Sequence, residues 1–384
     1  MKRRNIKFGI IGLGLMGREF ATAAARWCAL TDLAARPEIV GVCDSQEASF
    51  EWFRDNFPAI AQFTSNYHDL LANPEIEAIY CAVPHHFHRQ IYCDVIAAGK
   101  HLLGEKPFGV DLAAGEAIAE AAAARPGQLI RCASEFPFFP AVQKMARLFE
   151  AGSFGKIIEV NAGFHHSSDL NLNKPINWKR QSAANGDYGC LGDLGLHVCH
   201  FPFRANWRIR DVRAILSNLV PFRPDGKDGQ VPCDTWDNGT LFCRTAEADG
   251  AEFPMTLKMQ RIAPGEKDSW KLEIIGMKES ARFSTRKPNI LERCITDLNG
   301  KADWIEEEVG FTPSFPTITG PIFEFGFGDA ILQMWAGFID ELANGKPRSR
   351  FTGCITPAEA LLSHRLFTAA GISHREHRTV AITE

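Results

Sequence analysis

The sequence predicts an α/β protein that begins with a doubly wound parallel sheet and continues into an α+β region with an antiparallel sheet. Three observations support this prediction. A glycine-rich turn joins the first apolar strand to a helix, strands and helices alternate up to about residue 136, and later strands alternate between apolar and polar residues. Because 384 residues exceed the usual size of one hydrophobic core, we expect two domains, residues 1–136 and residues 137–384.

The glycine-rich turn follows the first strand, Ile6–Ile11, and reads Gly12-Leu13-Gly14-Leu15-Met16-Gly17. Its G-x-G-x-x-G spacing has a physical reason. Gly12 permits a tight turn, Gly14 lets the backbone approach a pyrophosphate, and Gly17 lets the next helix pack on the strand. The helix start offers free N–H groups and a positive dipole end to phosphates. A glycine-rich turn without a ligand is the alternative, but the strand-turn-helix context favours a dinucleotide site that includes Leu15 and Met16.

The second strand, Ile39–Cys43, ends in an acid, Asp44, which is followed by Ser45. At this position a carboxylate accepts hydrogen bonds from an adenosine ribose and repels a 2′-phosphate. Asp44 lies 27 residues after Gly17, against about 20 in the usual motif, which indicates a lengthened connection. No Arg or Lys occurs between the acid and Trp52, so we expect NAD rather than NADP. Asp44 can also cap the following helix, and the two roles are compatible.

Composition excludes several classes of protein. The net charge of −4 gives no basic excess for binding nucleic acid, and 45% hydrophobic residues are typical of a soluble globular protein. No apolar run approaches the roughly 20 residues of a membrane span, and the basic start Met1–Arg4 is followed by no signal-peptide cleavage site. The 11 cysteines include no C-x-x-C pair. We therefore expect a cytoplasmic protein without disulfides, a metal site, a nucleic-acid partner or a membrane partner.

Strands and helices alternate regularly after the second strand, as in a doubly wound parallel sheet. The expected helices are Ala48–Asn56, Tyr67–Leu71, Ile91–Ala98 and Asp111–Ala124, the last with Asp111 as its N-cap. The expected strands are Gln62–Thr64, Ala78–Val83, Lys100–Gly104 and Leu129–Ser134.

The pattern changes beyond about residue 138. A helix at Ala141–Ala151 leads to a strand at Lys156–Phe164, and the later strands Met255–Gln260 and Trp270–Ile274 alternate on a period of two. Such strands are typical of an antiparallel sheet with one covered face.

The last part of the chain is expected to be helical. Thr356-Pro357-Ala358-Glu359 has the pattern of a capping box with proline at the first helical position. An amphipathic helix before it presents one apolar face, formed by Ile331, Trp335, Phe338, Ile339 and Leu342. Two stretches rich in Gly and Pro, Pro221–Val231 and Gly310–Pro321, are expected to be long loops.

A lysine follows the fifth parallel strand in the run Glu105-Lys106-Pro107. It is therefore expected at the carboxyl edge of the sheet, where open α/β folds bind ligands. Lys106 can hold a substrate oxygen there or, if desolvated, exchange a proton near neutral pH. The alternative is a surface lysine in a turn.

Asp193 and His197 lie four residues apart in Gly192–His197. On a helix this spacing puts both side chains on one face, one turn apart. The carboxylate can then orient the imidazole, which can take a proton from an alcohol. We expect Asp193 to raise the pKa of His197 by stabilising the imidazolium. The alternative is an ordinary capping interaction.

Together these motifs resemble the Gfo/Idh/MocA family of oxidoreductases. The likeness rests on five motifs in order, which are Gly12/Gly14/Gly17, Asp44, Pro84 to His88, Glu105-Lys106-Pro107 and Gly192–His197. It implies an N-terminal Rossmann domain and an α+β domain with a large, open, mostly antiparallel sheet whose exposed face commonly makes oligomers. It also implies a catalytic set of Lys106, Asp193 and His197. In that set His197 is the base or acid for the substrate hydroxyl, Asp193 assists it, and Lys106 anchors and polarises the oxygen.

The resemblance implies further site residues. Glu105, Pro84 and His88 are expected to line the nicotinamide pocket, and Lys106 is expected to contact the cofactor as well as the substrate. Trp178 and His165 are expected at the substrate, where Trp178 can stack on a sugar face or the nicotinamide; a core tryptophan is the alternative.

The sequence also departs from the family pattern. The departures are His85 where Asn is usual, Pro137 where Arg is usual, Lys179 for Arg after Trp178, and His200 where Asp is common. They concern the pocket rim more than the chemistry, so they bear on substrate identity. A zinc site at the closely spaced His85, His86 and His88 is not expected, because no Cys or carboxylate at ligand spacing joins them.

The resulting hypothesis is an NAD-dependent dehydrogenase that acts on a secondary alcohol of a sugar, glycoside or cyclic polyol. One alternative is a relative that retains NAD and uses transient oxidation to hydrolyse or eliminate a glycosidic bond. Another is a non-catalytic, cofactor-binding regulatory protein. We further expect a homodimer or homotetramer that forms through the sheet of the second domain.

Overall fold

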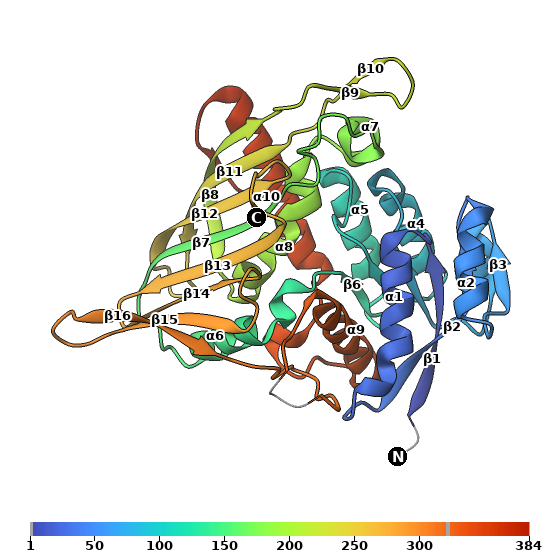
Figure 1. Ribbon diagram of the computed structural model, residues 1–384, viewed down its shortest axis with the longest axis horizontal. Helices are drawn as coiled ribbons and strands as arrows, with labels where there is room; N and C mark the ends of the chain where they lie inside the picture. The colour runs from blue at the N-terminus through green and yellow to red at the C-terminus, as the bar shows by residue number, and fades with distance from the viewer. Residues whose placement is uncertain (1–2, 320–322, 384) are drawn as a thin grey trace.

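Two large β-sheets with their covering helices make up the protein, in a computed structural model that describes residues 3–319 and 323–383. The six-stranded sheet belongs to the N-terminal part of the chain and the nine-stranded sheet to the C-terminal part (Figure 1). Within the described residues no helix is long and apolar enough to cross a membrane. The predicted α/β class is confirmed.

The first sheet is parallel throughout, in the order β3-β2-β1-β4-β5-β6. Its strands are β1 Arg4–Ile11, β2 Ala35–Cys43, β3 Gln62–Thr64, β4 Ala78–Cys81, β5 His101–Gly104 and β6 Ile130–Cys132. Its helices are α1 Leu15–Ala25, α2 Phe50–Asn56, α3 Tyr67–Ala72, α4 His88–Ala97 and α5 Leu112–Ala123. The strand order reverses between β1 and β4, so a ligand crevice is expected at the carboxyl ends of these two strands.

Local sequence explains why these elements form. Ile6, Phe8 and Ile10 of β1 are fully buried, as expected for a strand with helices on both faces. Asp111 caps α5, because its Oδ1 accepts a 2.7 Å hydrogen bond from the Ala114 amide. The predicted N-cap is therefore confirmed.

The second sheet has the order β16-β15-β14-β13-β7-β12-β11-β8-β17, and its neighbours are antiparallel except for the pair of β7 and β12. Its strands are β7 Ile157–His166, β8 Arg208–Ser217, β11 Asn238–Ala246, β12 Glu252–Gln260, β13 Asp268–Gly276, β14 Glu279–Ser284, β15 Ile290–Thr296, β16 Ala302–Glu308 and β17 Val380–Ala381. Alternate residues of β12 are buried, as the period of two predicted.

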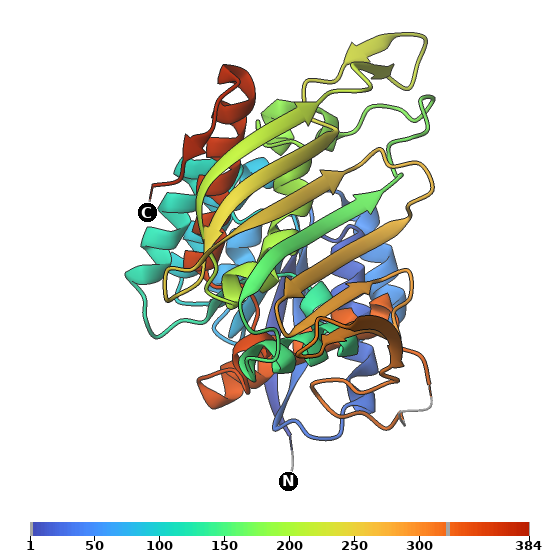
Figure 2. The same cartoon turned by 90° about the vertical axis from the view of Figure 1, so that its left-hand side faces the viewer.

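One face of the second sheet is covered by helices and the other is open, as Figure 2 shows. The covering helices are α6 Pro140–Glu150, α8 Cys190–Arg204 and α10 Pro357–Glu376. Between the sheet and these helices lies one hydrophobic core. β7 and β12 run with their carboxyl ends toward the helices of the first sheet (Figure 1). The residues at and just after these ends, such as His166 and Arg261, are polar, unlike those of the core.

The final helices connect the two parts of the molecule. In α9, Phe327–Asn344, Trp335 packs on Phe20 of α1 with ring centroids 3.8 Å apart. In α10 the predicted capping box is confirmed, because Thr356 and Glu359 hydrogen bond reciprocally. Buried residues of α9 thus belong to the core of the first sheet.

One predicted loop is wrong. Within Pro221–Val231 the structure has a hairpin of β9, Phe222–Pro224, and β10, Gln230–Pro232. Asp225 causes the turn, since its Oδ1 accepts hydrogen bonds from the amides of Lys227 and Gly229. The other predicted loop has no helix or strand through residue 319, and its end, Gly320 and Pro321, lies outside the described residues.

Candidate active site

The glycine turn after β1 has the geometry that its sequence predicts. Gly12 has φ of +93°, and a Cβ there would lie 2.4 Å from the Ala82 carbonyl oxygen. A Cβ on Gly17 would lie 2.2 Å from the carbonyl oxygen of Gly12. A Cβ on Gly14, by contrast, would meet nothing within 4 Å. The fold itself requires Gly12 and Gly17, whereas Gly14 leaves open space for a ligand next to the backbone.

The N-terminus of α1 opens into this space. Gly14 is the N-cap and supplies no side-chain hydrogen bond, and Leu15 at the first helical position is 74% exposed. The amides of Leu15 and Met16 have no partner within the helix, as is general for the first turn. They are therefore free to bind an anion such as a diphosphate.

Asp44 lies beside the same turn. Its Oδ2 accepts a 2.8 Å hydrogen bond from the Leu13 amide, and its Oδ1 accepts one of 2.8 Å from the Gln46 amide. The exposed Ser45 follows it. The carboxylate thus bridges the glycine turn and the end of β2 instead of capping α2, whose N-cap is Ser49. Each oxygen keeps a lone pair for a ribose hydroxyl, so the turn and the acid together fit an adenosine diphosphate.

The turn after β4 is held by a buried histidine. His88 Nδ1 lies 2.7 Å from the Pro107 carbonyl oxygen, and Nε2 lies 2.9 Å from that of Val83. Burial lowers the pKa of His88 to about 4, against the opposing effect of both carbonyls. Since backbone oxygens occupy both ring nitrogens, His88 supports the turn that carries Pro84.

Glu105 follows β5 at the carboxyl edge of the sheet. Its Oε1 accepts a 2.7 Å hydrogen bond from the Tyr80 hydroxyl, and its carbonyl oxygen accepts one of 2.8 Å from the Tyr92 hydroxyl. Burial raises the pKa of the Glu105 carboxyl. These two buried tyrosines fix the Glu105-Lys106-Pro107 run, so the Lys106 side chain leaves the sheet in a defined direction.

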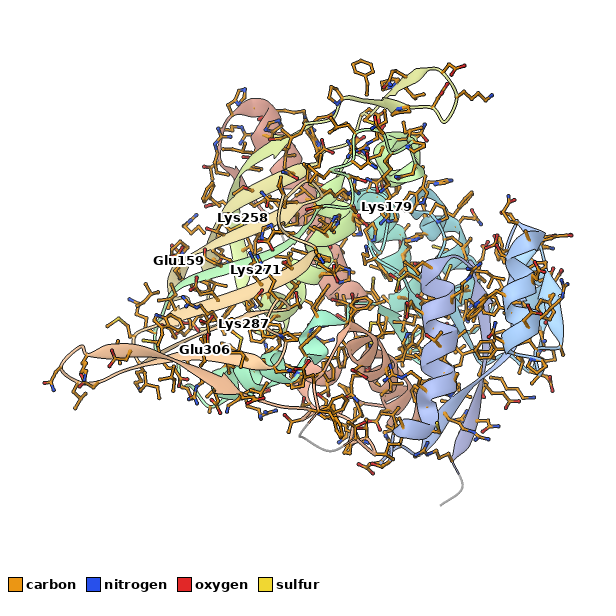
Figure 3. The ribbon with its side chains drawn as sticks, in the orientation of Figure 1. Glu159, Lys179, Lys258, Lys271, Lys287 and Glu306 are labelled. Atoms are coloured by element: carbon orange, nitrogen blue, oxygen red, sulfur yellow. The ribbon has the colours of Figure 1, made fainter. Side chains whose placement is uncertain are left out.

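Lys106 reaches the second part of the chain at Asp193. Its Nζ donates a 2.6 Å hydrogen bond to the Asp193 carbonyl oxygen and one of 2.9 Å to Oδ1. Lys179 Nζ donates to the same Oδ1 at 2.9 Å, and Arg261 Nε donates to Oδ2 at 3.2 Å. Three cations therefore surround one buried carboxylate. In Figure 3 Lys179 lies between the second sheet and the helices of the first, whereas Lys258 lies along the strands.

Asp193 and the cations around it shift each other's pKa values, although burial together with Lys106 and Arg261 gives Lys179 a net lowering of its pKa. Burial alone would raise the pKa of Asp193, but Lys106, Lys179 and Arg261 outweigh it and hold that pKa well below its usual range. Burial lowers the pKa of Lys106, but Asp193 and Glu105 outweigh it, and the net shift is upward. At neutral pH Asp193 is ionised and Lys106 is protonated.

The expected pairing of Asp193 with His197 is wrong. The Asp193 carboxylate binds the three cations, and His197 Nδ1 faces two other groups, Ser134 Oγ at 3.2 Å and Glu135 Oε2 at 3.7 Å. Burial and the Lys106 charge lower the pKa of His197 well below its usual value, and the opposing effect of Asp193 is smaller. His197 is therefore a neutral imidazole at pH 7: Asp193 raises its pKa, as predicted, but burial and Lys106 lower it by more. The i, i+4 spacing put both residues on one helix face but could not show which partners compete for the carboxylate.

Beside the cluster lies a cavity of about 300 Å³. It is lined by His166, Ser168, Asp169, Lys174, Asn177, Trp178, Lys179, Asp193 and Arg261. Trp178 also packs edge-on against the His85 ring, with centroids 4.7 Å apart, so it bridges the second part of the chain and the turn after β4. Trp178 is thus part of the site and not of the core.

His166 lines this cavity, whereas His165, the histidine predicted at the substrate, does not. Successive side chains of a strand point to opposite faces, and Phe164 and His166 share the face covered by helices. His165 points to the open face, where its Nδ1 lies 2.7 Å from Gln260 Oε1.

Sequence reasoning also missed Arg261 and gave Lys179 no role, although a signal existed for the arginine. Met255, Leu257 and Met259 mark the buried face of β12, and Arg261 continues their phase. A charged residue in the phase of an apolar face is unusual unless it is paired. For Lys179 we find no comparable signal.

No metal site emerges from the described residues. Across residues 3–319 and 323–383, no group of three or more His, Cys, Asp or Glu side chains is arranged to hold a metal ion. Of the closely spaced histidines, His85 and His86 face backbone carbonyls of Asn185 and Ala184.

Comparison with known proteins agrees with this geometry. Residues 6–131 match the family model of an oxidoreductase family with an NAD-binding Rossmann fold, and residues 142–282 match the C-terminal domain of the same family. The chain belongs to the GFO/IDH/MocA oxidoreductase family. The resemblance inferred from five motifs is thereby confirmed, as is the assignment of the first sheet to an NAD-binding Rossmann fold.

Among GFO/IDH/MocA relatives, an uncharacterized oxidoreductase of Synechocystis sp. is 30% identical over 58% of this chain and 58% of its own length. The levoglucosan dehydrogenase of Pseudarthrobacter phenanthrenivorans is 25% identical over 85% of this chain and 83% of its own. Of solved structures, an oxidoreductase domain protein from Kribbella flavida has a TM-score of 0.89 at 23% identity, covering 99% of this chain and 100% of that one. A levoglucosan dehydrogenase complex with NADH and levoglucosan has a TM-score of 0.88 at 22% identity, with the same coverage. These structural likenesses show a shared fold.

Proposed function

We propose that the protein is an NAD-dependent dehydrogenase that oxidises a secondary alcohol of a sugar, glycoside or cyclic polyol. The observation that carries this proposal is the meeting of Lys106 with Asp193, with His197 one turn further along α8, at the carboxyl edge of the Rossmann sheet. Relatives named as levoglucosan dehydrogenase, glucose-6-phosphate 3-dehydrogenase and inositol 2-dehydrogenase support the substrate class.

Each residue of the site has a separate role in the proposed reaction. NAD, when bound, supplies the acceptor for the hydride. Lys106 holds the substrate oxygen and stabilises the charge that develops on it as the proton leaves. His197, neutral and with Nδ1 facing Ser134 and Glu135, takes the hydroxyl proton on Nε2. Asp193 acts on Lys106, which it keeps charged and in place.

Binding residues follow from their positions. We infer that Gly12 to Gly17 hold the diphosphate, and that Asp44 and Ser45 hold the adenosine ribose. Because no base faces Asp44 in its described contacts, NAD is preferred to NADP. Glu105 and Pro84 line the nicotinamide pocket with the support of His88, and Trp178 stacks on the sugar.

We further propose two domains, residues 1–136 and 137–384, and a homodimer or homotetramer formed through the open face of the second sheet. This face has a hollow of about 350 Å³ with charges of both signs, from Lys258, Lys271, Glu273, Arg282 and Glu292. In a two-fold contact each patch meets a copy of itself. A patch with charges of both signs can then place its positive groups against the negative groups of its copy.

A screen of the purified protein tests the proposal. Sugars and inositols are supplied with NAD or NADP, and reduction of the cofactor is followed by its fluorescence. Steady NADH formation with a free sugar or polyol supports the dehydrogenase. Turnover of glycosides without net NADH would replace it with the transient-oxidation reaction, and tight NAD binding without any turnover would indicate a regulatory protein.

A further inference from the structure

Next to the His197 ring lies a buried carboxyl group, that of Glu135, to which no role has been assigned so far. Glu135 follows β6, just as Glu105 follows β5, and these strands are neighbours in the parallel sheet. Their carboxyl ends therefore bring both glutamates to the same edge. The Glu135 side chain is only 8% exposed, and its Oε2 lies 3.7 Å from His197 Nδ1.

The tautomer of His197 decides whether it can act as a base. A neutral imidazole carries one proton, so Nε2 can accept the substrate proton only if Nδ1 carries the ring proton. Ser134 Oγ, 3.2 Å from Nδ1, can donate or accept and therefore selects neither tautomer. An ionised carboxylate only accepts, so Glu135 favours the proton on Nδ1.

We propose that Glu135 is the positioning residue of His197, holding the ring proton on Nδ1 so that Nε2 is free to take the proton of the substrate hydroxyl. This inference rests on the proposed function for the identity of the base. As the C–H hydride leaves for the cofactor, the O–H proton passes to Nε2. The resulting imidazolium, with a proton on each nitrogen, is then stabilised by the Glu135 carboxylate, and its extra proton is released to water.

The surroundings of Glu135 set the pH range of this effect. Burial and the Glu105 charge raise the pKa of Glu135 to about 8. The charged and titratable groups around it are Glu105 and Lys106 after β5, Tyr80 in β4, Asp268 in β13 and His197 in α8. The neutral acid can donate as well as accept and favours neither tautomer, whereas the carboxylate, which favours the proton on Nδ1, becomes the major form as the pH rises through about 8. Alcohol oxidation should therefore accelerate as the pH rises through about 8.

Nitrogen NMR of the histidines tests the pair without any substrate. The full-length protein with bound NAD is labelled with ¹⁵N-histidine, His197 is assigned by its loss in His197→Asn, and its two nitrogens are followed from pH 6 to 10. In the wild type we expect the proton on Nδ1 to become dominant through an inflection near pH 8. Glu135→Gln should abolish that inflection. Glu247→Gln is the matched control, because burial raises the pKa of Glu247 as well but this residue lies between β11 and β12.

Kinetics give a second, independent readout, with levoglucosan and NAD as the probe reaction. Glu135→Gln should lower kcat at pH 9 by about 100-fold, at the lower end of what one positioned acid–base group contributes. It should leave the affinity for NAD unchanged, and Glu135→Asp should restore part of the rate. If the wild type does not oxidise levoglucosan, the choice of substrate fails while the NMR result still decides the role of Glu135. An unchanged His197 inflection in Glu135→Gln would overturn the inference.

Discussion

Lys106 and Asp193 lie 87 residues apart in the chain and are joined by two hydrogen bonds, from Lys106 Nζ to the backbone and side-chain oxygens of Asp193. The lysine comes from the edge of the Rossmann sheet and the aspartate from α8, which covers the second sheet. Lys106 therefore makes these contacts only when both parts of the chain are packed together. The Asp193 carboxylate thus contacts Lys106, whereas His197 contacts Ser134 and Glu135.

Removal of the Asp193 charge should destabilise the fold. In Asp193→Asn three cations face a neutral amide, and two of them, Lys106 and Arg261, are largely buried, where leaving a charge unpaired typically costs about 3–5 kcal/mol. The free energy of unfolding, measured by denaturant titration, should fall by about this amount. Asp303→Asn is the control, because Asp303 is 77% exposed and its only described ion pair is with Lys301 at 3.8 Å, so its loss should cost less than about 1 kcal/mol. If the free energy of unfolding fell equally in Asp193→Asn and Asp303→Asn, the ion pairs of Asp193 would stabilise the fold no more than an exposed ion pair does.

Two glycines of the cofactor turn should respond differently to alanine. A Cβ at position 17 would lie 2.2 Å from the Gly12 oxygen, so Gly17→Ala should lower the melting temperature. A Cβ at position 14 meets no protein atom within 4 Å, so Gly14→Ala should keep the stability and weaken NAD. Calorimetric titration with NAD, alongside thermal unfolding, separates the two effects. A Gly14→Ala variant with wild-type NAD affinity would show that the diphosphate lies elsewhere.

Cofactor preference should depend on Asp44. Asp44→Ala removes an acceptor for the ribose and a group that repels a 2′-phosphate, so NAD affinity should fall and the gap to NADP should narrow. Because the carboxylate also accepts from the Leu13 amide, the glycine turn loses one hydrogen bond. Asp44→Asn keeps an oxygen acceptor for that bond and separates the two causes. Tighter binding of NADP than NAD by the wild type would refute this role.

Assembly should depend on the open face of the second sheet. Lys258→Glu reverses one charge in the hollow on this face and should shift the assembly toward smaller species in light scattering at micromolar concentration. Lys227→Glu, in the turn between β9 and β10, makes the same change outside the face and should have no effect. A monomeric wild type would contradict the proposed assembly.

The fold could be predicted well because its signals are local. The glycine spacing, the alternation of strands with helices and the capping box at Thr356 each depend on neighbouring residues, and each is confirmed. The hairpin within Pro221–Val231 was missed, because its strands are three residues each and include prolines, which weaken a strand pattern.

The site was harder to predict because its contacts join distant segments. Asp193 and His197 are correctly placed one turn apart, but their partners come from the segments that follow β5, β6 and β12 and from the segment around Lys179. Sequence spacing contains no information about which distant side chains bind the Asp193 carboxylate in place of His197. For His165 and His166 the information was present, since the alternation of β7 assigns His166 to the covered face.

The central claim is that Lys106 and His197 act on the substrate oxygen and not on the cofactor. Its most direct test compares kcat and the dissociation constant for NAD in Lys106→Met and His197→Asn, with the substrate that the screen identifies. We predict that kcat falls by about 10²–10⁴-fold in each variant, the usual contribution of one positioned acid–base group, while NAD affinity changes little. Near-normal turnover in either variant, or loss of NAD binding in His197→Asn, would contradict the account.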